Sequence, residues 1–284
     1  MTMKTCKHLL PPFLTALLTL SAPVMARDDL HNCYNPVMPY IDQSLVKTPE
    51  RELFVLTDQT VRYEKKLAAE LLRKTLDYIR QGDKITVVSF SANANTHYTE
   101  LEFSGAMERP LPDTALNNTP TKHIRAYKRC LTWQEKSGKK AIAKGIVKAL
   151  TLPDDNYDFT NTEIIGAINT LANDLIGKSE IRERILVLYS DGFENSRLTT
   201  FFKKGDIRLI KPKTEIVKVK KAKMIPDLSG VKVYVIGGGW LEDGSLYLDS
   251  RKLKALRDFW GAFFAASGAS LEGFGQPMLL TELR

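Results

Sequence analysis

Short apolar runs alternate along the chain with segments of helical periodicity, and this alternation constrains the fold more than any other feature. Residues 51–57 ("RELFVLT") and 84–90 ("KITVVSF") are typical of strands, while residues 62–80 between them carry leucines at helical spacing. A strand, a helix and a second strand in this order form a right-handed unit with two parallel, buried strands. The sequence therefore predicts a parallel sheet covered by helices.

The second half of the chain repeats the alternation. A predicted helix at residues 162–175 precedes the strand 184–189 ("RILVLY"), and the strand 231–236 ("VKVYVI") precedes a helix at residues 249–266. Strands that alternate with helices in this way indicate an α/β protein. We expect a doubly wound, mostly parallel sheet flanked by helices, a Rossmann-like arrangement.

Two segments interrupt this order. Residues 92–158 contain Asn- and Pro-rich turn sequences around one candidate helix at residues 135–150, so we expect an irregular insertion or an irregular half of the domain there. Residues 203–223 contain nine basic residues against Asp206 and Glu215, and their apolar alternation predicts a basic hairpin. A basic segment attracts nucleic acid, anionic lipid headgroups or cell-wall polymers. A solvated hairpin or an acidic protein partner is the simpler interpretation, and no nucleic acid partner is expected.

The first residues have the layout of a secretory signal peptide. Lys4 and Lys7 precede an apolar stretch at residues 13–20, and small residues lead to Ala26 before the first charged pair. The apolar stretch is shorter than the roughly 20 residues that span a bilayer, and no later stretch comes close. We predict cleavage of residues 1–26 near Ala26, a periplasmic or secreted product, and no transmembrane segment in the mature chain. Loss of the two lysines lowers the formal net charge from +8 to +6.

Two cysteines remain after this cleavage, Cys33 and Cys130. In an oxidising compartment one disulfide between them is the simplest expectation, and two buried free thiols are the alternative. Zinc binding is not expected, because neither cysteine has a second one at ligand spacing and His31, His97 and His123 form no cluster in the sequence.

Polar residues follow the predicted strands where ligands gather in an open parallel sheet, at the carboxyl ends. Asp58 and Thr60 follow the first strand, Thr160 and Thr162 precede the middle helix, and Asp191 follows the strand 184–189. Hydroxyl and carboxylate oxygens are hard ligands that suit Mg²⁺, Mn²⁺ or Ca²⁺, with water in the remaining positions. These residues are therefore candidates for a divalent-metal site.

The stretches "DQTVR", "TEIIGAI" and "YSDGFENS" resemble, in this order, the metal-ion-dependent adhesion site of the von Willebrand factor type A domain. That site is written DxSxS after the first strand, then a threonine in a later loop, then an aspartate after the fourth strand. The resemblance covers residues 51–270, between a lead segment 27–50 and a tail 271–284, and residues 92–158 fit it poorly. It implies a binding module in which an acidic side chain of a protein partner completes the coordination of the ion.

The resemblance also implies a role for each matching residue. Asp58 would hold the ion directly or through water, and Thr60 would donate its hydroxyl oxygen in place of the first serine of the motif. Thr162 matches the family threonine, because small and apolar residues follow it at the usual distance. Asp191 would complete the set through a water.

One position departs from the motif. Arg62 stands at the second serine, and a guanidinium has donors but no acceptor, so it cannot bind a cation. Two outcomes stay open: Arg62 points outward and leaves a site with more water, or it pairs with Asp58 or Asp191 and replaces the metal. Thr160 and Ser190 flank the site in either case.

Three functions remain open from the sequence. The first is an exported, non-enzymatic binding module that uses a divalent metal. The second is a metal-assisted hydrolase at the same strand ends, for which no histidine or activated nucleophile is evident in the motif. The third is a metal-free structural component of an envelope assembly. Asp58, Thr60 and Thr162 also suit helix caps, and Asp191 with Gly192 suits a turn; neither role needs a ligand.

Overall fold

The computed structural model describes residues 28–62, 64–93, 96–151, 161–241, 248–275 and 277–284. The predicted signal peptide and the candidate site residue Thr160 lie outside these ranges, so both stay predictions. No helix in the described ranges combines the length and the apolar character that a bilayer crossing requires.

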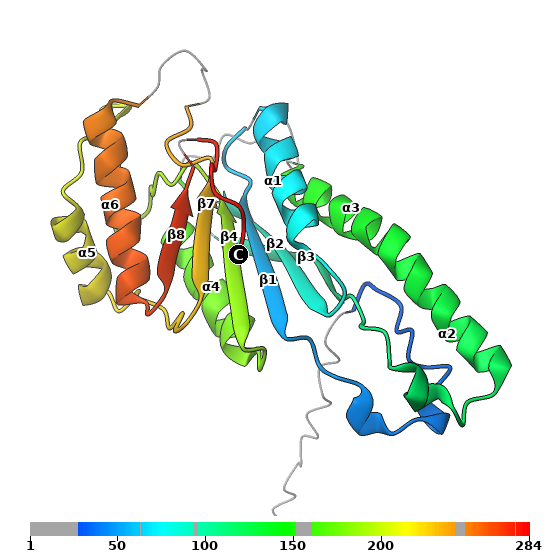
Figure 1. Ribbon diagram of the computed structural model, residues 1–284. Coiled ribbons are helices and arrows are strands. Elements are labelled where there is room, and N and C mark those ends of the chain that lie inside the picture. Colours follow the sequence, from blue (N-terminus) through cyan, green and yellow to red (C-terminus); the bar gives the residue numbers. More distant parts are fainter. Residues whose placement is uncertain (1–27, 63, 94–95, 152–160, 242–247, 276) are drawn as a thin grey trace, which may run out of the picture.

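The centre of the protein is a six-stranded sheet with the order β3-β2-β1-β4-β7-β8 (Figure 1). All neighbouring strands are parallel except β3, which runs antiparallel to β2. This confirms the predicted mostly parallel sheet. The strands are β1 (Arg51–Asp58), β2 (Asp83–Asn93), β3 (Thr96–Ala106), β4 (Glu183–Tyr189), β7 (Lys232–Ile236) and β8 (Ser270–Phe274).

Helices cover both faces of this sheet (Figure 1). They are α1 (Lys65–Tyr78), α2 (Thr121–Trp133), α3 (Lys139–Leu150), α4 (Ile164–Asp174), α5 (Pro212–Lys221) and α6 (Ser250–Ala266). Alternate residues of β1 show the two layers: Leu53 and Val55 pack in the cluster that includes residues of α1 and α3, whereas Phe54 and Leu56 pack in the cluster with α4, α5 and α6. The unbroken apolar run of β1 follows from this burial on both sides.

The described residues of the segment 92–158, which are 92–93 and 96–151, form mostly regular strands and helices and not an irregular insertion, which corrects the sequence prediction. They supply the edge strand β3 and then α2, a five-residue π-helix (Gln134–Gly138) and α3, which form a nearly continuous helical segment. The predicted helix 135–150 corresponds to the last two of these. Helix α3 can lie close to β3 because Gly145 has no side chain: a Cβ there would stand 2.5 Å from Cβ of Phe103.

The segment 203–223 is mostly a helix, so the predicted basic hairpin is wrong for most of its length. A two-residue hairpin, β5 (Phe202–Lys203) with β6 (Asp206–Ile207), occupies only its start, and α5 follows. Proline at the first helical position begins α5. Ile216 and Val219 then lie on one buried face at helical spacing.

The boundary predicted at residue 270 is also wrong. Strand β8 continues to Phe274 and pairs with β7, so the sheet includes the start of the predicted tail. The remaining residues pack against α1, where the N–H of Leu279 donates to the Glu70 carboxylate at 3.0 Å and Lys74 donates to the carbonyl of Thr281 at 2.8 Å. The described residues after β8, 275 and 277–284, are therefore part of the folded domain.

The lead segment forms a small apolar cluster of its own against α2. Cys33 and Cys130 are joined by a disulfide, as the sequence predicts, with 5.3 Å between their Cα atoms. Tyr34, Val37 and Tyr127 are buried with Cys33 in this cluster. It lies apart from the two clusters that cover the sheet, so the disulfide adds a covalent link where the apolar contact area is small.

Replacement of both cysteines, Cys33→Ser with Cys130→Ser, is expected to lower the free energy of unfolding by about 2–4 kcal/mol, because a separation of 97 residues makes the bridge a strong restraint on the unfolded chain. Urea unfolding of the parent and the double variant measures this difference. Equal midpoints and slopes for the two proteins would contradict the expectation.

Candidate metal centre at the carboxyl ends of β1 and β4

The candidate site lies where the direction of chain progression across the sheet reverses. From β1 the chain proceeds to β2 and β3 on one side, and then returns to β4 on the other side of β1. Loops that leave β1 and β4 therefore diverge and leave room for a ligand between them. Asp58 ends β1, and Ser190 and Asp191 directly follow β4.

Asp58 is buried beneath the site at the end of β1, with 2% of its surface exposed. One carboxylate oxygen, Oδ1, accepts hydrogen bonds from the N–H and the hydroxyl of Thr60, at 2.9 and 2.6 Å. The other, Oδ2, accepts from the hydroxyl of Ser190 at 2.8 Å. The carboxylate thus fixes the positions of two hydroxyl groups that come from different loops.

Thr60 and Thr162 bring their hydroxyl oxygens within 2.9 Å of each other. Thr162 is held in place by a pair of backbone hydrogen bonds with Asn195, at 3.0 and 2.8 Å. The sequence prediction that the "DQTVR" and "TEIIGAI" stretches meet is therefore matched by the geometry.

Asp191 lies in a tight turn after β4. Its carboxylate Oδ1 accepts from the N–H of Phe193 at 2.8 Å, and its carbonyl accepts from the N–H of Gly239 at the same distance. Gly192 adopts a positive φ of 78°, and its carbonyl accepts a hydrogen bond from the indole N–H of Trp260 at 3.0 Å. The buried Trp260 of helix α6 therefore helps to hold the turn that carries Asp191.

These residues surround a cavity of about 340 Å³. Thr60, Thr162, Asp191 and Asn195 supply its polar lining, and we call the remaining, apolar lining residues its apolar wall. The apolar residues are Val61, Phe193, Phe202, Ile207, Trp240 and Leu241. Arg62 is exposed and is not among the described lining residues.

The donor set consists mainly of hydroxyl and carboxylate oxygens. Within the described ranges, no three His, Cys, Asp or Glu side chains gather closely enough to hold a metal by themselves. Burial raises the pKa of Asp58 to about 6, and the hydrogen bonds from Thr60 and Ser190 offset only part of this effect. A cation in the adjacent cavity would favour the ionised carboxylate.

Neither the apolar wall nor a buried acid, Glu194, was predicted from the sequence. Burial raises the pKa of Glu194 to about 8, although its carboxylate accepts a hydrogen bond from the N–H of Ile165 at 3.0 Å. Glu194 thus sits at the beginning of α4, where the helix dipole favours a negative charge. Its position three residues after Asp191 in "SDGFENS" was the one feature of the sequence that placed this acid near the site.

No protein-family model and no curated protein sequence matches this chain. Among solved structures, it is similar to an aerotolerance-related membrane protein from Bacteroides fragilis NCTC 9343 that carries multiple mutations to serine. The identity is 14%, the TM-score is 0.32, and the match covers 80% of this chain and 92% of the other.

A second similar structure is the pilus adhesin SpaC from Lactobacillus rhamnosus GG in its open conformation. The identity is 10%, the TM-score is 0.36, and the match covers 81% of this chain. This chain spans 29% of the length of the adhesin. Likenesses this distant carry no inference about function.

Glu194→Gln is expected to reduce the loss of stability between pH 5 and pH 8. The pKa of Glu194 in the folded protein, about 8, lies above its ordinary 4.5, so its contribution is complete below about 4.5 and is lost as the pH rises toward 8. Glutamine does not titrate in this range. Urea unfolding at several pH values, with a chelator present, measures the effect.

The exposed Glu180 offers a matched control, since Glu180→Gln makes the same chemical change on the surface. The control variant should keep the pH dependence of the parent. A Glu194→Gln variant that keeps it as well would contradict the proposed cause.

Proposed function

We propose that this protein is an exported, non-enzymatic binding module of the von Willebrand factor type A kind, periplasmic or secreted, which holds a divalent cation at the carboxyl ends of β1 and β4. One observation carries the proposal: the hydroxyls of Thr60 and Thr162 lie 2.9 Å apart on the wall of the cavity that Asp191 also lines. Three separate loops thereby direct oxygen donors into one space.

The donors suit a hard cation such as Mg²⁺ or Mn²⁺, with Ca²⁺ as a further candidate. Such ions take about six oxygen ligands and readily keep several waters. Two threonine hydroxyls and the carboxylate of Asp191 would supply the protein ligands, and the rest of the cavity has room for water and for a partner. The ion would supply positive charge and open coordination positions for an incoming oxygen.

Asp58 would act mainly through its neighbours. Both of its oxygens already accept hydrogen bonds, from Thr60 and from Ser190, and it does not line the cavity. In this proposal the negative charge of Asp58 stabilises the cation without direct coordination, and its hydrogen bonds orient the hydroxyls of Thr60 and Ser190. Direct coordination would require it to give up one of these contacts.

Of the two outcomes for Arg62, the proposal takes the outward one. Its side chain is exposed, and both carboxylate oxygens of Asp58 accept hydrogen bonds from Thr60 and Ser190, which argues against a pair with Asp58. The loss of the second hydroxyl of the motif leaves a coordination position to water. A positive charge nearby still opposes the cation, so we expect weaker metal affinity than a full set of hydroxyls would give.

The partner would be a protein segment that presents an acidic side chain to the ion. The apolar wall adds a second requirement, because Phe202, Ile207 and Leu241 would contact whatever accompanies that carboxylate. An acidic residue beside a large apolar residue therefore fits the cavity better than an isolated acid. The described lining contains no histidine, cysteine or lysine, which favours binding over the hydrolase alternative.

Mg²⁺ or Mn²⁺ is expected to raise the thermal unfolding temperature of the purified protein by about 5 °C at a hundredfold excess over the dissociation constant, because a ligand that binds only the folded state stabilises it. Asp191→Ala should abolish the gain. Thermal unfolding with and without the metal, after treatment with a chelator, measures both.

Asp174→Ala provides the control, since Asp174 is an exposed acid at the end of α4 and does not line the cavity. This variant should keep the full response to metal. A parent protein without any response would favour the metal-free structural role instead.

Arg62→Ser should strengthen metal binding, by about tenfold or more, because it removes one positive charge and restores a hydroxyl at the second serine position of the motif. Titration calorimetry with Mn²⁺ on the parent and the variant measures the ratio. Equal affinities would show that Arg62 has no influence on the site.

A further inference from the structure

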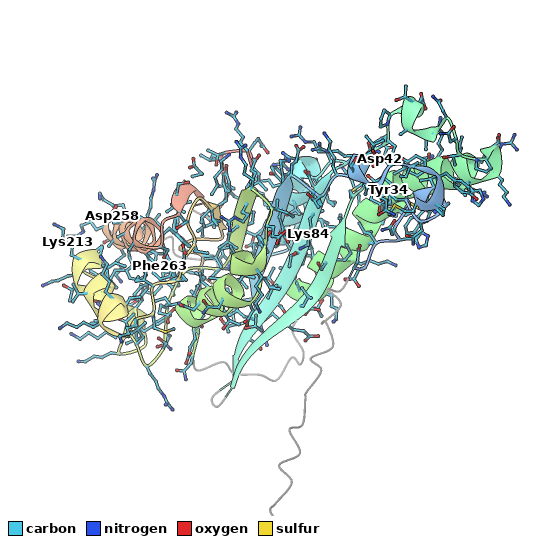
Figure 2. The ribbon with its side chains drawn as sticks, turned by 90° about the horizontal axis from the view of Figure 1, so that it is seen from below. Tyr34, Asp42, Lys84, Lys213, Asp258 and Phe263 are labelled. Atoms are coloured by element: carbon cyan, nitrogen blue, oxygen red, sulfur yellow. A yellow bond between two sulfur atoms is a disulfide. The ribbon has the colours of Figure 1, made fainter. Side chains whose placement is uncertain are left out.

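Helix α5 presents a basic surface that the candidate metal site does not use. We name it the α5 basic face and define it by Val217 and five lysines, Lys211, Lys213, Lys220, Lys221 and Lys223, all of which are exposed. Lys213 and Lys221 stand four residues to either side of Val217, one turn away on the same face of the helix. Figure 2 shows Lys213 at an outer end of the molecule.

Among the residues that the structure describes, no acidic side chain forms an ion pair that neutralises the positive charge of this face. Both acids of the surrounding segment are engaged elsewhere: buried Glu215 pairs with Arg208 at 2.9 Å and with Lys218 at 2.7 Å, and Asp206 pairs with Lys252 at 3.3 Å. In the described part of the chain, no carboxylate forms an ion pair with the five lysines of the face.

The neighbouring helix α6 does not supply the missing negative charge either. Its exposed Asp258 pairs with Lys254 at 2.5 Å, and Asp249 at its start pairs with Arg251 at 3.5 Å. Three of the five lysines lie in helix α5 and the other two flank it. These like charges repel one another, so a bound anionic surface would relieve the repulsion.

Aliphatic side chains are exposed among and beside these lysines. Val217 is 48% exposed at the centre of the face, and Leu209, two residues before Lys211, is 53% exposed. A helix with lysines around exposed aliphatic groups suits the interface of an anionic bilayer, where the cations meet headgroups and the aliphatic groups enter the boundary.

Other anionic partners fit this surface less well. The helix and its flanking residues from Lys211 to Lys223 include no aromatic side chain, on which single-stranded nucleic acid would stack. They also lack the Trp, Tyr and Arg that dominate binding energy at protein interfaces.

We propose that the α5 basic face is a docking surface for anionic phospholipid headgroups, and that it places the protein peripherally on a membrane. The contact is electrostatic with a small aliphatic contribution. It is therefore reversible and weakens as the salt concentration rises. It requires no metal and does not depend on the function proposed for the strand ends.

Sedimentation of the protein with lipid vesicles tests this proposal. The parent should bind vesicles of phosphatidylglycerol and phosphatidylcholine in equal parts, and should not bind pure phosphatidylcholine. The triple variant Lys213→Gln, Lys220→Gln, Lys221→Gln should bind the anionic vesicles about a hundredfold more weakly, given the usual contribution of a lysine near an anionic leaflet. Val217→Ser should weaken binding by a smaller factor.

A second triple variant, Lys136→Gln, Lys140→Gln, Lys144→Gln, removes the same charge from exposed positions in the π-helix and the first half of α3. It should bind almost as the parent does, whereas an equal loss in both variants would show that only net charge matters and would overturn the proposal. Absence of vesicle binding by the parent would overturn it too. So would binding of polyglutamate without binding of vesicles, since the partner would then be an acidic polypeptide.

Discussion

The carboxylate of Asp58 connects the two strands at the centre of the sheet, and the arrangement of the strand ends depends on it. Its bonds to Thr60 and Ser190 join the loop after β1 to the loop after β4 inside the protein. A buried carboxylate is costly unless its oxygens are satisfied, so both loops must keep their positions. The hydrogen bonds that offset the cost of burying Asp58 therefore also fix Thr60 on the polar side of the cavity.

The parallel core could be predicted from the sequence because its strands are buried on both faces. Continuous apolar runs such as those in β1 and β4 are typical of strands buried on both faces, and their order along the chain limits the possible topologies. Edge elements carry a weaker signal. Strand β3 includes Thr and Glu residues that suit an exposed strand or a loop equally well, so its pairing with β2 was not expected.

The error over α5 has a similar origin. In "EIVKVKK" the apolar residues fit both a period of two and a helical period, and β-branched side chains favour a strand. Tertiary packing favours the helix, because the helical conformation buries Ile216 and Val219 on one face and lets Glu215 form ion pairs with Arg208 and Lys218. The candidate metal residues were foreseeable from their order in a motif, whereas the apolar wall was not, since Phe202 and Leu241 join it only in space.

The order of the elements across the sheet determines how the molecule would stand on a lipid surface. Helix α5 lies beyond β8 at one end of this order, and α2 lies with the disulfide-linked lead segment beyond β3 at the other (Figure 1). Contact through α5 would set the strands roughly parallel to the bilayer. The mouth of the cavity would then open sideways, toward a neighbour seated at the same height above the membrane, and the disulfide would lie on the side farthest from the lipid.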